Sequence, residues 1–460
     1  MNKSNIKYSS INFIFKDAKD INYLNELKIN FNNVKSLTIK KEKNSIINNY
    51  GYFLKTFTSF NNIKNNLVYL YLESFNNRIS NIEAELLMNL SDFKVLEILI
   101  LKNFHFQNAF ILKLDNLKTL EILFCSNISI DKNTCLGIKK LYLIYSNIHK
   151  IFFLDFPELE DFNLNYVHGI INVINFNNLN KLKRFIGTTS DFLNLGKTSL
   201  EYVKLTQTPD NTLDKERELL RKIISIKTLK NIELWLNVID TDTINLINYV
   251  NKTVEIACIY WTFPENDCIL YSLQKKFPNL SDLSLYFLNN KKCQTKLEIT
   301  ENEECKINKI SLIVFKNENI KFYCNSFENL IKIDFTFNNE IINIKDCFPI
   351  FSDECKVKFK SLTKFKLYIN YEIELNIIKN IYKNIDSIPN LIYFSLNCNV
   401  KEINKDFYIK FINKILSKKL SLIYLKLTTN EELYLLNELK KICNNIKTLN
   451  LDKINIYKIK

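Results

Sequence analysis

The side chains with the widest catalytic and metal-binding chemistry in this 460-residue sequence are eleven cysteines and three histidines. A thiolate acts as a nucleophile beside an imidazole, and thiolates and imidazoles are the usual ligands of zinc. The cysteines are widely spaced without a Cys-x-x-Cys pair, and His105, His149 and His168 stand far apart. A thiol such as Cys135 is therefore expected to meet a histidine only by chance. The odd number and the spacing predict free thiols in a reducing compartment.

Other catalytic and cofactor motifs are missing from the sequence. It contains neither the phosphate loops GxxxxGK[ST] and GxGxxG nor the signatures HExxH and GxSxG. The acidic run from Glu301 to Glu304 lacks the alternating ligand spacing of a calcium loop, so we interpret it as a solvated loop. We interpret Trp235 and Trp261 as a residue on a sheet face and a packing residue. The sequence predicts a protein that is not an enzyme and needs no cofactor or metal.

The formal net charge of +14 suggests a nucleic-acid or anionic-surface partner. Lysine supplies most of this charge, and the arginines, whose planar fork reads phosphates and guanine edges, are confined to Arg78, Arg184, Arg217 and Arg221. The lysines are scattered among acidic residues. The chain is also rich in Asn, Ile, Lys, Phe and Tyr, whose codons are AT-rich. These observations favour the interpretation that the positive charge reflects codon bias and a solvated surface, and not electrostatic binding of a partner.

Targeting and membrane signals are also missing. The amino terminus is polar and leads to no secretory signal, and no apolar run approaches the length of a transmembrane helix. The content of hydrophobic residues, 47%, is sufficient for a large core and argues against disorder. We therefore predict a folded cytoplasmic protein.

One apolar spacing recurs along the whole chain. In the segment 277–285 the residues Phe277, Leu280, Leu283 and Leu285 are separated by three, three and two positions. The segments 156–164 and 388–396 repeat this spacing, with a proline at the same place. Related cores lie about 18 to 32 residues apart, which is typical of a repeat array.

These segments resemble the leucine-rich-repeat family, whose core motif is Leu-x-x-Leu-x-Leu-x-x-Asn/Cys. The closest matches are Leu96-Glu-Ile-Leu99-Ile-Leu101-Lys-Asn103 and Leu120-Glu-Ile-Leu123-Phe-Cys125-Ser-Asn127. In both, asparagine stands one place early. In the family this asparagine binds the backbone of the turn, so its displacement implies irregular, diverged repeats. Irregular arrays of similar composition occur in expanded multigene families of AT-rich microbial eukaryotes and of large DNA viruses.

The resemblance implies an α/β solenoid, a leucine-rich-repeat horseshoe with a parallel β-sheet on its concave side. We expect short turns and 3-10 segments on the convex side in the first half and α-helices there in the second half. Residues 1–30 are predicted to be an N-terminal cap, and residues 31–460 one continuous solenoid of about 15–17 repeats whose last one or two act as a C-terminal cap. The array is expected to be monomeric. Helical spacing is found at 214–224, 372–385, 405–416 and 431–443.

The alternation of a strand predicts which residues face outward from the sheet. In the early repeats these positions are apolar and aromatic, and they are our candidate contacts with a protein partner: Tyr69, Tyr71, Ile98, Ile100, Ile122, Phe124, Tyr142 and Ile144. In the later repeats they are polar. Two alternatives stay open, because a one-residue slip would exchange the faces and the N-terminal segment could cover the patch.

Three functions compete at this level. The first is a non-catalytic protein–protein interaction scaffold that binds an unknown partner through the concave surface. The second is an F-box-like substrate adaptor for ubiquitin ligation that docks through residues 1–30, although this segment lacks the Leu-Pro start of an F-box. The third is a lysine-mediated binder of nucleic acid or of an anionic surface, which the scattered charge disfavours.

Overall fold

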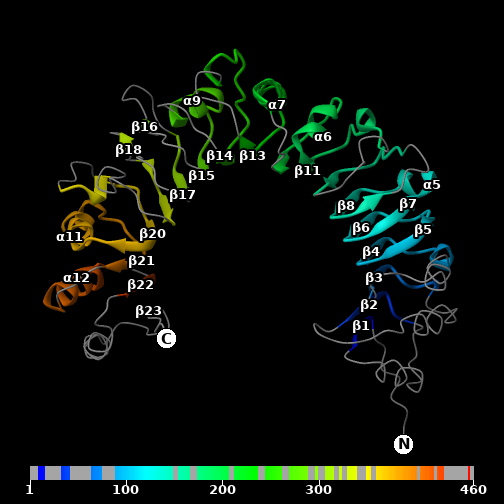
Figure 1. Cartoon of the computed structure of the whole chain (residues 1–460), viewed down its shortest axis with the longest axis horizontal. Coiled ribbons are helices and arrows are strands. Elements are labelled where there is room, and N and C mark those ends of the chain that lie inside the picture. The colour runs from blue at the N-terminus through cyan, green and yellow to red at the C-terminus, as the bar shows by residue number, and fades with distance from the viewer. Residues whose placement is uncertain are drawn as a thin grey trace, which may run out of the picture. The chain divides into compact units, whose positions relative to one another are not determined.

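The structure is a computed structural model of the whole chain. It describes the following residues: 9–15, 33–41, 64–74, 89–148, 154–165, 174–206, 212–236, 244–261, 269–287, 296–298, 306–314, 321–323, 329–338, 349–353, 359–400, 405–418, 422–428 and 454–455. The chain forms two compact units, Met1–Thr208 and Pro209–Lys460. Each unit is built on a parallel sheet to which successive repeats contribute one strand each (Figure 1).

The main sheet of the first unit is parallel throughout the part that is described. Its strands, in spatial order, are β1 (Ser10–Phe15), β2 (Ser36–Lys41), β3 (Tyr69–Glu73), β4 (Ile98–Lys102), β6 (Thr119–Leu123), β8 (Lys140–Ile144), β10 (Asp161–Asn163), β11 (Arg184–Thr188) and β12 (Tyr202–Thr206). In β3 and β4 the residues alternate between half-buried and buried, so that Leu70 and Leu72 enter the core while their neighbours face out. This is the leucine-rich-repeat arrangement that the sequence predicts.

The segments between these strands contain a second sheet that the sequence analysis did not predict. Strands β5 (His105–Leu112), β7 (Ser126–Ile130) and β9 (Asn147–Ile148) pair in parallel. The remaining elements among the described residues of this unit are short: η1 (Asn89–Asp92), α5 (Lys132–Leu136), η3 (Phe176–Asn178) and α6 (Thr189–Asn194). Short elements suit repeats whose strands lie only about 20 residues apart, since a long helix would not fit.

The turns after β4 and β6 are each held by a side chain of the next repeat. The backbone N–H of Phe104 points to Cys125 Sγ at 3.4 Å, and the N–H of Cys125 donates to Ser146 Oγ at 3.1 Å. Ser146 Oγ also donates toward Ile144 O at 2.9 Å. Cys125 and Ser146 are buried. A thiol and a hydroxyl thus bind the turn backbone where the family motif has asparagine or cysteine.

The main sheet of the second unit is also parallel over the described residues. In spatial order it contains β13 (Asn231–Leu236), β14 (Ile256–Trp261), β15 (Asp282–Phe287), β17 (Lys309–Val314), β19 (Lys332–Phe337), β20 (Lys364–Ile373), β21 (Tyr393–Val400), β22 (Leu422–Thr428) and β23 (Ile454–Asn455). A further pair, β16 (Lys296–Glu298) and β18 (Lys321–Tyr323), lies outside this sheet.

Longer helices connect the strands of the second unit. In the described part of the unit they are α7 (Leu213–Ser225), α9 (Ile269–Lys276), α11 (Leu375–Asn384) and α12 (Lys405–Ser417), with short 3-10 turns η5 (Pro349–Phe351) and η6 (Ile385–Ser387). Helices α7, α11 and α12 stand where apolar spacing predicts them, whereas the predicted helix at 431–443 lies outside the described residues. In Figure 1, α11 and α12 lie on one side of β20, β21 and β22.

Buried asparagines fasten these helices to neighbouring segments. In α11, Asn380 Nδ2 donates to Phe351 O at 2.8 Å, and Asn384 Nδ2 donates to Ser352 O at 2.7 Å. Asn251 Nδ2 donates to Ile226 O, just beyond the end of α7, at 2.8 Å. Because carbonyls at helix ends and turns have no partner within the element, each amide satisfies a group that would otherwise be buried without a hydrogen bond.

The predicted core register is correct in most repeats and wrong at β6, which is described with the candidate surface below, and at β14. Leu280, Leu283 and Leu285 are fully buried, as predicted. At β14 the apolar spacing of Val254 and Ile256 predicts that both enter the core, but Ile256 is 41% exposed, and Ala257 and Ile259 are buried instead. Small Ala257 supplies little apolar signal, so the pattern favoured its larger neighbour. Of residues 1–30, the described part forms β1, which extends the sheet beside β2; the capping role of residues 1–30 stays a prediction.

Candidate partner-binding surface

Six of the eight predicted contact residues face outward from the sheet of the first unit. They are Tyr69 and Tyr71 on β3, Ile98 and Ile100 on β4, and Tyr142 and Ile144 on β8. All six are half-buried, because each lies against the neighbouring strand but is open to solvent above. Tyr69 stands beside Ile98 and Tyr71 beside Ile100 in the strand register. We call these six residues the apolar face.

The prediction that Ile122 faces outward was wrong. Leu120 and Ile122 are fully buried, while Glu121 and Leu123 face out. The motif of this repeat is therefore Leu117-x-x-Leu120-x-Ile122-x-x-Cys125, three residues earlier than the sequence interpretation. Residues of one parity share a face of a strand, so Ile122 must follow Leu120 into the core.

Phe124 is exposed, but it lies in a turn and not on the strand. Its exposed fraction is 44%, and that of Tyr145 in the equivalent turn after β8 is 51%. Both have positive φ, 55° and 49°. Their rings stack with centroids 5.1 Å apart and planes 4° from parallel. The pair extends the aromatic surface beyond the carboxyl ends of β6 and β8, and Tyr145 was not identified from the sequence.

Two carboxylates on the outward face are neutralised by a cation from the next strand. Glu73 Oε1 lies 2.9 Å from Lys102 Nζ, and Asp161 Oδ1 lies 3.0 Å from Arg184 Nη1. Each of these carboxylates also accepts a hydrogen bond from a tyrosine hydroxyl. Tyr71 Oη donates to Glu73 at 3.2 Å, and Tyr142 Oη donates to Asp161 at 2.6 Å.

Glu121 lies between these two groups. It stands beside Ile100 on β4 and Tyr142 on β8. Among the described residues, no cation lies within ion-pair distance of its carboxylate. Burial raises the pKa of Glu121; the charge of Asp161 adds to this shift, and Lys140 opposes it.

The second unit carries an aromatic ladder that the sequence analysis did not predict as a unit. Trp235, Tyr260 and Tyr286 occupy one row of β13, β14 and β15. Their ring centroids are 4.3 Å apart at both steps, with planes inclined by 4° and 23°. Each of these residues comes directly after the second inward residue of its strand. An aromatic residue at this same position in three successive repeats is the sequence signal of the ladder. Burial and the nearby Cys258 and Glu233 raise the pKa of Tyr260, which keeps its hydroxyl protonated.

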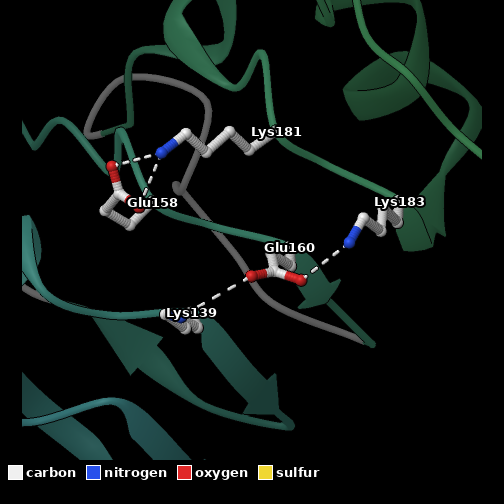
Figure 2. A network of polar contacts seen from close by, with 5 residues as sticks. All are labelled: Lys139, Glu158, Glu160, Lys181 and Lys183. Atoms are coloured by element: carbon white, nitrogen blue, oxygen red, sulfur yellow. Dashed lines mark hydrogen bonds and ion pairs between the residues drawn. The ribbon is translucent and has the colours of Figure 1, made fainter.

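Many lysines pair with acids of an adjacent repeat. Figure 2 shows Glu158 bound by Lys181, with Nζ–Oε1 at 2.6 Å, and Glu160 between Lys183 at 3.1 Å and Lys139 at 3.9 Å. The hydrogen bond and charge of Lys183 lower the pKa of the exposed Glu160. Such exposed pairs add little stability, but they cancel local charge and favour the native order of repeats.

Three lysines share one outward row of the second unit. Lys309, Lys332 and Lys364 are neighbours on β17, β19 and β20. Lys309 Nζ lies 3.3 Å from Asp282, on the adjacent strand β15. The row is therefore a local concentration of positive charge that is neutralised in part.

Cys125, Cys135 and Cys398 are poorly suited to nucleophilic chemistry. Burial raises the pKa of Cys125 to about 12 and that of Cys135 to about 12, and it also raises the pKa of Cys398. Since the thiolate is the reactive form, these groups remain protonated at neutral pH. Within the part of the chain that the structure describes, no three His, Cys, Asp or Glu side chains are grouped as a metal site.

Comparison with known proteins yields similarity of structure alone. No family model and no curated protein matches the chain. The chain is similar to the crystal structure of the TLR13–ssRNA13 complex, with 14% identity and a TM-score of 0.44 over 93% of this chain and 66% of that chain. It is also similar to one of the mouse RP105/MD-1 complex, with 12% identity and a TM-score of 0.40 over 92% of this chain and 84% of that chain. Among the described residues no helix has both the length and the apolar character needed to cross a bilayer.

Proposed function

We propose that the chain is a non-catalytic scaffold that binds a partner protein through the apolar face of its first unit and the adjoining stacked pair Phe124 and Tyr145. The observation that carries this proposal is the alignment of Tyr71, Ile100 and Tyr142 along one outward row of the parallel sheet, interrupted only by Glu121. Solvent-facing positions of a sheet are ordinarily polar, and a contiguous apolar and aromatic patch is typical of an interface.

Two further observations support this proposal. Tyrosine is enriched among the residues that dominate interface energies, because it buries a large area and loses little conformational entropy. Two of the three tyrosine hydroxyls of the apolar face, those of Tyr71 and Tyr142, are already oriented by Glu73 and Asp161. A partner would therefore meet a surface whose side chains need little rearrangement on binding.

The test compares partner capture by the wild-type chain with capture by a Tyr71→Ser/Phe124→Ser variant. We expect affinity enrichment from the native cell, quantified by mass spectrometry, to lose its specific partner in the variant. The matched control is Tyr368→Ser, a half-buried outward tyrosine of the second unit. Direct titration of the purified partner should show at least a tenfold weaker Kd for the double variant, since two interface aromatics are removed. Equal binding by all three proteins would contradict the proposal.

A second candidate function rests on the lysine row of the second unit. Lys309, Lys332 and Lys364 could contact phosphates of a nucleic acid or of an anionic membrane. Binding of single-stranded RNA, duplex DNA or phosphatidylserine vesicles should then fall steeply with salt and weaken in a Lys332→Gln/Lys364→Gln variant. Binding that is absent, or insensitive to salt, excludes this candidate.

A further inference from the structure

Glu121 occupies the middle of the apolar face, with apolar or aromatic neighbours on both sides. The outward row runs Tyr71, Ile100, Glu121, Tyr142 over four successive strands. Adjacent strands of a sheet lie about 4.8 Å apart, so each of these residues is the direct neighbour of the next in the row. A carboxylate at this place is held above the sheet between Ile100 and Tyr142.

The other two carboxylates on this part of the face have partners within the chain, and Glu121 has none among the described residues. Glu73 binds Lys102, and Asp161 binds Arg184. The cation that acts most on Glu121 is Lys140, which is exposed and does not approach to ion-pair distance. An ionised carboxylate in a partly desolvated position is unfavourable until a cation approaches it.

The surrounding tyrosines provide the rest of a site for a cation. Burial raises the pKa of Tyr69, Tyr71 and Tyr142, and the negative charge of Glu121 adds to each shift. The faces of these neutral rings are electron-rich and attract a lysine or arginine side chain. Ile100 can pack against the aliphatic stem of the same side chain.

We propose that Glu121 anchors a basic side chain, arginine or lysine, of the partner protein, with Tyr71, Ile100 and Tyr142 packed around it. This inference rests on the proposed function and specifies the chemistry of the partner at one position. Charge complementarity selects the occupant, because the site lacks one positive charge. The apolar and aromatic residues around Glu121 favour apolar atoms beside that positive charge. A protein partner supplies both the charge and the apolar atoms. A bound metal ion would need more ligands than this site offers.

A random peptide library displayed on phage and selected on the immobilised full-length chain tests the inference without a known partner. Selected sequences should share a basic residue next to apolar residues. In synthetic peptides, replacing this residue with glutamine should weaken binding to the wild-type chain about tenfold, as expected for a charge-assisted contact that is only partly buried. The same replacement should have little effect on binding to Glu121→Gln.

Two controls separate a specific pair from a general charge effect. Glu158→Gln removes the same charge from a carboxylate bound to Lys181, away from the apolar face, and should leave peptide binding unchanged. Exchanging the charges, with Glu121→Lys on the chain and glutamate in the peptide, should restore most of the lost affinity. Far-UV circular dichroism and the urea midpoint establish that each variant is folded.

The possible outcomes distinguish this inference from the proposed function. If selected peptides lose binding in Tyr71→Ser but carry no preferred basic residue, the apolar face binds protein and the assignment to Glu121 is overturned. If peptides are insensitive to both Tyr71→Ser and Glu121→Gln, or if none is enriched, both proposals are overturned. Enriched basic residues whose contribution disappears in Glu121→Gln support both.

Discussion

Ile122 and Leu123 are adjacent residues of β6 whose side chains face opposite sides of the sheet, so truncating each in turn measures the register. Ile122 is fully buried, and Leu123 is half-buried on the outward face. Ile122→Ala removes buried methyl groups and leaves a cavity, which should cost about 2–5 kcal/mol of unfolding free energy. Leu123→Ala removes partly solvated atoms and should cost about 1 kcal/mol or less.

Urea unfolding followed by far-UV circular dichroism converts these energies into midpoints. For a unit of this size the dependence of unfolding free energy on urea is roughly 2–3 kcal/mol per molar, so Ile122→Ala should lower the midpoint by about 1 M. Both tryptophans of the chain, Trp235 and Trp261, lie in the second unit, and their fluorescence gives an independent record of that unit. A larger loss for Leu123→Ala than for Ile122→Ala would refute the register and support the Leu120-x-x-Leu123 interpretation.

Three further predictions address stability and charge. Leu283→Ala should cost about 2–5 kcal/mol in urea unfolding followed by tryptophan fluorescence, because Leu283 is fully buried; a cost below about 1 kcal/mol would contradict its place in the core. Ser146→Ala should cost about 1–3 kcal/mol in the same assay followed by circular dichroism, because the buried N–H of Cys125 loses its acceptor; an unchanged midpoint would mean that another group replaces the hydroxyl. The pKa of Glu121 in the folded chain is raised above its ordinary value of 4.5. The stability that this carboxyl contributes to the fold is therefore present below pH 4.5 and is lost as the pH rises through the raised pKa. Glu121→Gln should therefore unfold at higher urea than the wild type at neutral pH, with a difference that shrinks on acidification; a difference independent of pH would exclude titration of Glu121 as its cause.

The repeating strands could be predicted from the sequence because the buried positions are chemically simple. In repeats such as that of Leu280, Leu283 and Leu285, the outward residues are polar, and the alternation allows one register only. The parallel sheet then follows, since one repeat cannot bury its apolar side alone and each strand must stack on the next.

The register failed where apolar residues occupy both parities of a strand. From Leu120 to Cys125 every residue except Glu121 is apolar, so either face could enter the core by composition alone. The structure resolves the choice through contacts between repeats, because Cys125 must lie where its sulfur meets the N–H of Phe104. That contact joins residues 21 positions apart, which a pattern within one strand does not report.

The candidate surface was predictable only in part for a similar reason. Single outward residues can be read from a strand, but the partners of Glu73 and Asp161, and the absence of one for Glu121 among the described residues, depend on which strands become neighbours. Composition also misled the interpretation of asparagine. Codon bias accounts for its abundance, yet the amides of Asn251 and Asn384 are buried and bind carbonyls of adjacent segments.

The turn contacts between Phe104, Cys125 and Ser146 have a consequence for how such an array can change in length. Each step joins residues that are 21 positions apart. The pair Glu97–Lys118 spans the same 21 positions. Excision of residues 105–125 would bring Phe104 to the hydroxyl of Ser146 and Glu97 to Lys139, the lysine that occupies the equivalent place in the next repeat. Loss or duplication of this segment by unequal recombination would thus produce a chain with matching junctions, whereas a deletion within these repeats that is not a multiple of 21 residues would break the contacts at the junction.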